Sequence, residues 1–259
     1  ASSLRTVEGG SVAFSATAAD ANEDPLSFDW DFGDGTHSST AAAAHAWGAE
    51  GTYEVVLTVG DGLAATVVRA AIDVVNGAPV VVPLELPAIV NEGSPVDFRG
   101  HATDPAPADT LTYTWDFGDG APAASGAHTT HTYADDGTFT ATLTVGDGVD
   151  ATVRARVLEV RNVPPVLAAI TTKNADVARP LVFELAASDV AGPLDPLTFS
   201  LVEGPGTVSA GGTYSDTPTA KEVGAHVVRV RVTDDDGGAT DAVFGLVVHE
   251  EGIRIVELG

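Results

Sequence analysis

The chain has no cysteine and no methionine among its 259 residues. Without cysteine it can form no disulfide bond and no thiolate site, and the redox compartment cannot be read from cysteine usage. Because the sequence begins with alanine and lacks methionine, we expect a processed form or a fragment, in which an export signal would no longer be visible.

Basic residues are also scarce, since 12 Lys and Arg stand against 37 Asp and Glu, for a formal net charge of −25. Phosphate backbones and anionic membrane surfaces attract basic proteins, so this balance argues against nucleic acid or an anionic membrane as a partner. No apolar run approaches the ~18 residues that a membrane span needs. The charge favours cation binding, although most of these acids are expected to form a solvated surface.

Two phrases of the sequence recur at a nearly constant interval. The string WDFGDG occupies residues 30–35 and 115–120, and LTVGDG occupies residues 57–62 and 143–148. Self-similarity at one period indicates a string of domains, each slightly shorter than the ~100 residues of an immunoglobulin-like sandwich. Pro and Gly interrupt the apolar pattern at NGAP and NVPP, where we place the boundaries. We therefore predict a sandwich at 1–76 that lacks its first strand, sandwiches at 77–162 and 163–250, and an extra C-terminal strand at 251–259.

Within each repeat the apolar residues recur with a period of two. In TYEVVLTV, Tyr53, Val55, Leu57 and Val59 alternate with mostly polar neighbours, and TFTATLTV at 138–145 repeats the pattern. Such alternation is typical of half-buried strands, and the sequence shows no convincing amphipathic helix. The predicted fold class is all-β, as three tandem immunoglobulin-like antiparallel β-sandwiches.

The two acids of the repeated WDFGDG string invite a catalytic interpretation. However, Gly and Asp together are typical of a tight turn, in which Asp accepts hydrogen bonds from its own backbone. Asp116 and Asp119 flank such a turn, and the sequence supplies no accompanying base or nucleophile. No Ser-His-Asp order or phosphate-binding glycine loop is visible either, and the seven histidines show no convincing zinc pattern. We therefore predict a hairpin rather than an active site, and a protein that is not an enzyme.

These strings also carry a family resemblance. WDFGDG followed by HTYADDGTFTATLTVGDG at 131–148 resembles the PKD domain (polycystic kidney disease repeat), and HAWGAEGTYEVVLTVGDG at 45–62 gives the same match for the first repeat. The resemblance covers residues 1–162. The third repeat has LTFSLVEGPG at 197–206 in place of the motif and is similar to bacterial cadherin-like or Ig-like repeats. The resemblance implies an extracellular or cell-surface protein of a bacterium or archaeon, with modules that contact protein or polysaccharide without catalysis.

Acids and amides recur at three places in the repeats: the junction between repeats, the loop before the tryptophan strand, and the loop after the longest strand. In a sandwich these places can meet at one end and offer the oxygen ligands that Ca²⁺ prefers. Some PKD-like and cadherin-like repeats bind calcium near such junctions, which supports the idea, whereas the alternative is that these loops are simply good turns. The candidate Ca²⁺ ligands are Asn76, Asp104 and Asp147, then Asn162, Asp189 and Asp234, and in the first repeat Asp20 and Asp61.

The two ends of the chain suggest a further hypothesis. The first repeat has no counterpart of GAPVVVPLE at 77–85, while Ile253, Ile255 and Leu258 in EGIRIVELG could form one spare strand. Copies could then join head to tail by strand addition into a filament or sheath. The alternative, which has at least the same weight, is arbitrary truncation of a longer array in which IRIVEL begins the next repeat. We predict a non-catalytic extracellular structural or adhesive rod that contacts protein, itself included, or polysaccharide. The second choice is the accessory PKD region of a secreted chitinase or protease.

Overall fold

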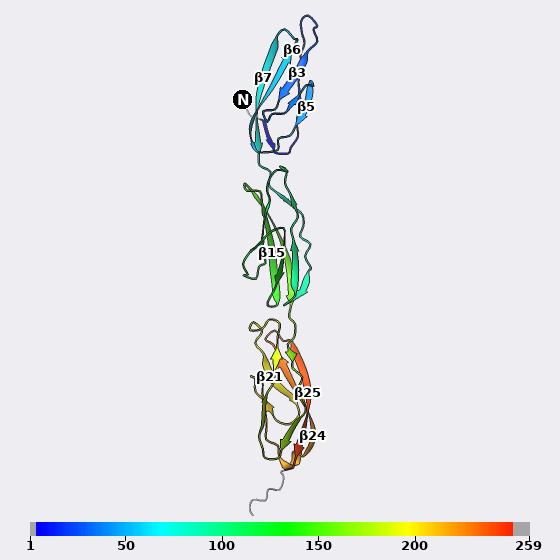
Figure 1. Ribbon diagram of the computed structural model, residues 1–259, viewed down its shortest axis with the longest axis vertical. Coiled ribbons are helices and arrows are strands. Elements are labelled where there is room, and N and C mark those ends of the chain that lie inside the picture. Colours follow the sequence, from blue (N-terminus) through cyan, green and yellow to red (C-terminus); the bar gives the residue numbers. More distant parts are fainter. Residues whose placement is uncertain (1–3, 251–259) are drawn as a thin grey trace, which may run out of the picture. The chain divides into compact units, whose positions relative to one another are not determined.

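A computed structural model describes residues 4–250 of the protein, and their secondary structure is almost entirely β (Figure 1). The described residues pack into two compact units. One holds residues 4–86, 97–129 and 140–156, and the other holds residues 87–96, 130–139 and 157–250. Because this division passes through the second repeat, the domain limits expected from the sequence stay a prediction.

The first repeat lies wholly in the first unit. Its strands are β1 (Leu4–Val7), β2 (Val12–Ser15), β3 (Ser27–Asp31), β4 (His37–Ser38), β5 (Ala42–His45), β6 (Gly51–Gly60) and β7 (Ala65–Val75). One sheet has the order β1-β7-β6-β3-β4, and β2 and β5 form the second layer. β6 pairs with β3 and β7 in antiparallel fashion, whereas β1 joins the edge of β7 in parallel. Figure 1 shows β3, β6 and β7 side by side in the blue and cyan part of the chain.

The second repeat contributes strands to both units. They are β8 (Val80–Val81), β9 (Ile89–Asn91), β10 (Pro95–Arg99), β11 (Ala102–Thr103), β12 (Thr112–Asp116), β13 (Ala124–Ser125), β14 (His128–Thr132), β15 (Gly137–Gly146) and β16 (Ala151–Arg161). In the first unit β8 pairs with β11, and β12 pairs with β13 and β15. In the second unit β9 joins β16 in parallel, as β1 joins β7 in the first repeat.

The third repeat completes the second unit. Its elements are β17 (Val166–Leu167), β18 (Lys173–Asp176), β19 (Leu181–Glu184), β20 (Ala187–Ser188), β21 (Thr198–Glu203), β22 (Thr207–Val208), β23 (Thr213–Asp216), the 3₁₀ turn η1 (Ala220–Glu222), β24 (Gly224–Thr233) and β25 (Ala239–His249). A sheet of order β18-β25-β24-β21 faces a sheet of order β19-β23-β22, and β17 pairs with β20. The structure therefore confirms the all-β prediction of tandem immunoglobulin-like sandwiches.

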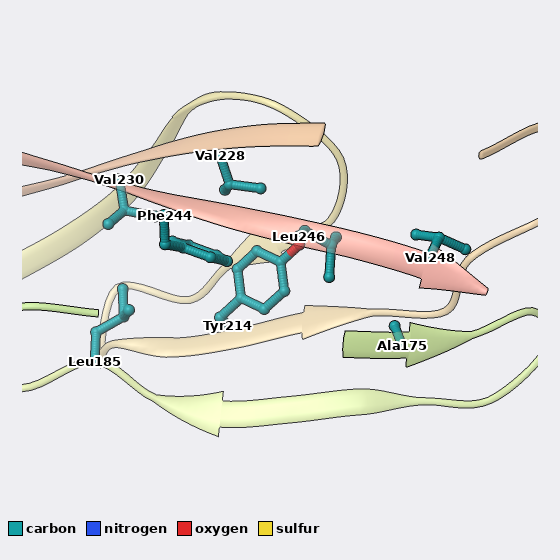
Figure 2. Close-up of a cluster of buried hydrophobic side chains, with 8 residues drawn as sticks. All are labelled: Ala175, Leu185, Tyr214, Val228, Val230, Phe244, Leu246 and Val248. Atoms are coloured by element: carbon teal, nitrogen blue, oxygen red, sulfur yellow. The ribbon is translucent and has the colours of Figure 1, made fainter. Parts of the chain in front are cut away.

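The alternating residues predicted to be apolar and inward-facing do form the cores. In the third repeat Val228, Val230, Phe244 and Leu246 from β24 and β25 pack around the ring of Tyr214 (Figure 2). The first repeat has a separate core around its two tryptophans. Burial of these side chains supplies most of the stabilisation, at roughly 1.5–3 kcal/mol for each fully buried large apolar residue.

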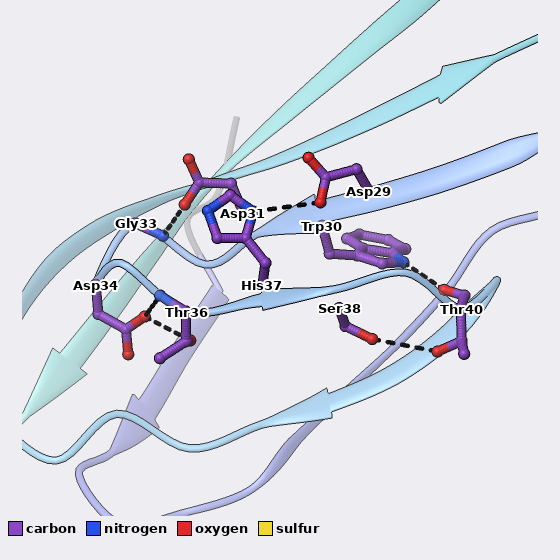
Figure 3. Close-up of polar contacts among 9 residues, drawn as sticks. All are labelled: Asp29, Trp30, Asp31, Gly33, Asp34, Thr36, His37, Ser38 and Thr40. Carbon is purple, nitrogen blue, oxygen red and sulfur yellow. Dashed lines mark hydrogen bonds and ion pairs between the residues drawn. The ribbon is translucent and has the colours of Figure 1, made fainter. Parts of the chain in front are cut away.

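The repeated WDFGDG string forms the hairpin turn that the sequence predicts. Trp30 and Asp31 of β3 pair with Ser38 and His37 of β4. The Asp31 carboxylate accepts a hydrogen bond from the backbone N–H of Gly33 at 2.9 Å, and Asp34 accepts one from Thr36 at 3.0 Å (Figure 3). The second copy repeats both contacts with its own aspartates. Each acid therefore stabilises its own turn.

The first glycine of this turn is more constrained than the second. Gly33 and Gly35 both have positive φ, at +81° and +87°. A Cβ on Gly33 would lie 2.8 Å from the carbonyl oxygen of Glu54, whereas a Cβ on Gly35 has nothing within 4 Å. The backbone of the turn thus rests directly on β6 at Gly33, and only glycine fits there.

We expect Gly33→Ala to destabilise the first repeat more than Gly35→Ala does. Both variants carry the ~1–2 kcal/mol cost of a left-handed alanine, and Gly33→Ala adds the clash with Glu54. Urea unfolding followed by tryptophan fluorescence would measure both free energies of unfolding. Equal losses in the two variants would contradict the close approach seen at Gly33.

Candidate metal centres

Three carboxylates meet in the first unit close to the start of the second repeat. Glu8 follows β1, Asp104 follows β11, and Asp109 lies in the loop before β12. One oxygen of each lies within 4.8 Å of the others, and we call this group the Glu8 cluster. Two oxygens bound to one Ca²⁺ at ~2.3–2.6 Å can be up to ~5 Å apart, so the spacing suits a shared ion.

Glu8 is held by the first residues of the second repeat. Its side chain is buried, with 1% of its surface exposed, and its Oε1 accepts a hydrogen bond from the Gly77 N–H at 2.8 Å. Its other oxygen, Oε2, is buried and has no hydrogen-bond partner in the described part of the chain. Asp104 is arranged likewise, because Oδ1 accepts from the Ala106 N–H while Oδ2 is buried and has no partner among the residues described. A buried carboxylate oxygen without a partner is costly, which makes these oxygens candidates for binding a cation.

Asn76 connects the same region to the loop after β15. Its amide Nδ2 donates to the carboxylates of Asp147 at 3.1 Å and Asp150 at 2.9 Å. The Asn76 Oδ1 is buried without a partner within residues 4–250. An amide oxygen is a common neutral ligand of Ca²⁺, so Asn76 can add to the three carboxylates.

The second unit holds a larger group of the same kind. Glu92, Asp189 and Asp195 lie within 4.8 Å of one another through one oxygen each, and so do Asp135, Asp195 and Asp236. We call these five residues the Asp195 cluster. Asp195 is 0% exposed, and neither of its carboxylate oxygens has a hydrogen-bond partner in the described chain.

The contacts around the Asp195 cluster repeat those around the Glu8 cluster. The Glu92 Oε1 accepts from the Val163 N–H at 2.6 Å, and the Asn162 amide donates to Asp234 at 2.9 Å. Asp189 Oδ1 accepts from a backbone N–H at 3.0 Å. The remaining oxygens, Oε2 of Glu92, Oδ1 of Asn162 and Oδ2 of Asp189, are buried and unpartnered among the residues described.

The carboxylates destabilise one another's charge. Loss of water on burial, followed by repulsion from neighbouring acids, raises the pKa of Glu8 and of Glu92. The same causes, burial first and then Glu92 and Asp189, raise the pKa of Asp195 to about 7. No ion pair with Lys, Arg or His involves either cluster within the described ranges. A divalent cation would supply the compensating charge.

The candidate ligands taken from the sequence fall into three groups in the structure. Asp104 is a member of the Glu8 cluster, and Asn76 and Asp147, which bond to each other, lie beside it. Asn162, Asp189 and Asp234 gather around the Asp195 cluster. Asp20 and Asp61 belong to no carboxylate cluster of the described residues. Each accepts backbone N–H groups of its own turn.

Six members of the two clusters were not among the ligands predicted from the sequence: Glu8, Glu92, Asp109, Asp135, Asp195 and Asp236. The two glutamates are marked by a repeated Glu-Gly pair, at 8–9 and 92–93, which resembles an ordinary turn. The structure shows why glycine follows the first of these glutamates. The backbone at Gly9 lies so close to Pro105 that a Cβ on Gly9 would collide with the carbonyl oxygen of Pro105. Asp109 and Asp195 are the last residues of DPAPAD and DVAGPLD, two loops that the sequence indicated, but only the first aspartate of each loop was predicted to be a ligand.

The first repeat also has an open apolar groove of about 600 Å³. Phe14, Trp30, Leu57 and Val59 line it, together with the segment 16–20. In the second and third repeats a short strand, β8 or β17, pairs beside the corresponding segment. No strand of the described chain pairs with residues 16–20, so the groove marks the place of that strand in the first repeat.

Comparison with known families agrees with the repeat pattern. The PKD domain model matches residues 2–74 and 76–161, which is more than half of the chain. The chain belongs to the PKD domain family. A bacterial Ig domain model matches residues 162–246, so two PKD domains precede one bacterial Ig domain. Such domains are typically non-catalytic modules of extracellular or cell-surface proteins, and domains of this kind mediate protein–protein contacts.

The chain is similar to part of chitinase A from Pseudoalteromonas piscicida, with 32% identity over 165 residues. The match covers 57% of this chain and only 19% of that chitinase. Among solved structures, the immunoglobulin domains 1–5 of Sidekick-1 match 96% of this chain and 57% of their own, at 14% identity and a TM-score of 0.37. Domains EC22–24 of mouse cadherin-23 match 96% of both chains, at 16% identity and a TM-score of 0.33. Within the part that the structure describes, no helix has the length and apolar character of a membrane span.

The raised pKa values predict how the metal-free protein responds to pH. An acid whose folded pKa is raised binds more protons in the folded state, so its contribution is complete below the unfolded pKa of ~3.9 and is lost as the pH rises through the folded value. For Asp195 that window extends from about pH 4 to about pH 7. In EDTA we expect the melting temperature to fall between pH 5 and pH 8, and Asp195→Asn to weaken that dependence. Calorimetry would measure it, and a melting temperature that rises over this range would contradict the buried repulsion.

Proposed function

We propose that the chain is a non-catalytic extracellular structural or adhesive protein whose junctions between repeats are held by Ca²⁺. The observation that carries this proposal is the convergence of buried, unpartnered carboxylate oxygens beside Gly77 and beside Val163, where one repeat leads into the next. Each group draws ligands from two successive repeats. The ion would therefore bind well only when both repeats are folded and in place.

The donor set favours calcium over other common cations. All ligands in the two clusters are carboxylate or amide oxygens, which suit hard cations. Zinc prefers the nitrogen and sulfur of His and Cys, and neither cluster contains a His. Magnesium keeps several waters and seldom uses an all-protein cage, whereas Ca²⁺ accepts 6–8 oxygens in flexible geometry.

A partner protein is a better match to this chain than a polysaccharide. Sugar-binding platforms stack sugars on broad exposed aromatic faces, but Trp30, Trp47 and Trp115 are 7%, 1% and 0% exposed. Their indole N–H groups donate to backbone carbonyls inside the sandwiches. All three tryptophans of the chain are thus structural, and we propose protein contact as the adhesive function.

A second candidate is the accessory region of a secreted hydrolase. The 32% identity to part of chitinase A favours it. In that case these domains would position or space a catalytic domain encoded in the same reading frame. The calcium clusters would serve the same structural purpose in either setting, because they hold neighbouring repeats and not a substrate.

We also propose that copies of the chain assemble head to tail, which the apolar groove of the first repeat supports. The spare strand expected from Ile253, Ile255 and Leu258 lies outside the described residues. Aligning His249 with Arg161, the last residues of β25 and β16, places Ile255 at Leu167 and Leu258 at Ile170. Those two residues pack against the core of the third repeat. The tail thus has the apolar pattern that the groove of the first repeat of another copy could accept.

Calcium should stabilise the protein through both clusters. We expect millimolar CaCl₂ to raise the melting temperature. Each occupied site would add ~2.7 kcal/mol to the free energy of unfolding when calcium is in hundredfold excess over its Kd. The double variant Glu8→Gln with Glu92→Gln should lose most of this gain. Glu54→Gln with Glu159→Gln removes two exposed glutamates and serves as the matched control. An unchanged melting temperature at millimolar calcium would count against the proposal.

Assembly should depend on the C-terminal segment. We expect the full chain at high concentration to give species larger than a monomer in light scattering and fibres in electron microscopy. A chain ending at residue 250, or the single variant Ile255→Asp, should remain monomeric, while Val227→Asp on the exposed face of β24 should behave as the full chain. A full chain that is monomeric at every concentration would refute strand addition.

A further inference from the structure

We infer that the Asp195 cluster binds two calcium ions bridged by the carboxylate of Asp195, whereas the Glu8 cluster binds one. This inference rests on the proposed function and adds the number of ions and the residue that joins them. It makes the junction before the bacterial Ig domain chemically different from the junction between the two PKD domains.

The first support is that the Asp195 cluster consists of two triads that share one member. Glu92, Asp189 and Asp195 form one triad, and Asp135, Asp195 and Asp236 form the other, each with its three oxygens within 4.8 Å. Each triad alone has the spacing that suits one cation. Asp195 therefore stands between two places at which a cation would be surrounded by carboxylates.

The second support is the state of Asp195 itself. Its side chain is fully buried, and both carboxylate oxygens lack a hydrogen-bond partner among the described residues. Most acids of the two clusters use one oxygen on a backbone N–H, as Glu92 and Asp189 do. A carboxylate with two free oxygens can give one to each of two metal ions, as carboxylates do in two-metal sites with ions ~3.5–4 Å apart.

The third support comes from comparing the two junctions within the chain. Asp109 takes the place of Asp195 at the Glu8 cluster, but Ala49 stands where Asp135 does, in HAWGAEG against HTYADDG. The turn after the long strand also differs. It closes from Asp147 to Asp150 in the second repeat but from Asp234 to Gly238 in the third, and the extra residue accompanies Asp236. The second triad thus has no counterpart at the Glu8 cluster within the described chain.

The formal charge of each cluster also favours one calcium ion at the Glu8 cluster and two at the Asp195 cluster. The Glu8 cluster has three carboxylates, and one Ca²⁺ leaves a formal charge of −1. The Asp195 cluster has five carboxylates, so one ion would leave −3 and two ions leave −1. Carboxylates held close together repel one another, and two ions leave both clusters with the same modest residual charge.

Calcium stoichiometry tests this inference. Isothermal titration calorimetry of the chelator-treated full chain, confirmed by equilibrium dialysis with ⁴⁵Ca²⁺, should give three ions per chain. Asp135→Asn with Asp236→Asn removes the second triad only and should give two. Neither residue is buried, so this variant should keep its fold, which circular dichroism checks. Asp97→Asn with Asp241→Asn makes the same change in net charge at two residues outside both clusters, and it should still bind three.

The outcomes separate this inference from the proposed function. Three ions in the wild type and two in the Asp135 and Asp236 double variant would support the shared site. Two ions in both chains would overturn it and leave calcium-bound junctions standing. No binding at millimolar calcium would overturn both. Loss of more than one ion in the double variant would contradict the inference, because it would mean that the ion held by Glu92 and Asp189 cannot bind without Asp135 and Asp236.

Discussion

The structure depends on a buried negative charge at each point where one repeat leads into the next. The carboxylate of Glu8 is removed from water, and the only hydrogen bond it accepts within the described chain comes from the N–H of Gly77. Glu92 stands in the same relation to Val163. A buried charge of this kind is unfavourable unless a cation completes it. No Lys, Arg or His among residues 4–250 forms an ion pair with either glutamate, so the compensating charge is the one we propose that Ca²⁺ supplies.

The sequence predicted much of the fold because sandwich strands have a local signature. The alternation in β6, β15 and β24 follows from the pleat of a strand, and the Gly-Asp-Gly turn follows from the backbone conformations that only glycine adopts easily. Both are read within ten residues. The parallel pairing of β1 with β7, and of β18 with β25, could not be read in this way. It joins segments about seventy residues apart, and no local pattern records the direction of a partner.

The candidate site was predicted only in part, for a related reason. Repetition of Asn76 and Asn162 and of Asp147 and Asp234 at one interval marked residues that share a role, and the structure places them at the junctions. No sequence feature of this kind distinguished Glu8 from an ordinary surface glutamate. Glutamate is usually exposed, and its burial here follows from the close contact between the loop at Gly9 and Pro105, which belongs to tertiary structure. Asp195 was missed because its distinguishing feature is the absence of a hydrogen-bond partner for its buried oxygens among residues 4–250, which a sequence does not show.

The third repeat shows that the sandwich fold itself does not require a glutamate at the position of Glu8 and Glu92. The N–H of Val177 bonds to the carbonyl of His249 as the N–H of Glu8 bonds to Val75 and that of Glu92 to Arg161, so Val177 occupies the place of the two glutamates. Its side chain packs against the core of that repeat. A sandwich therefore forms with an apolar residue at this position. An acid there costs stability to the repeat that carries it, and the proposed Ca²⁺ bound jointly with the neighbouring repeat would offset that cost.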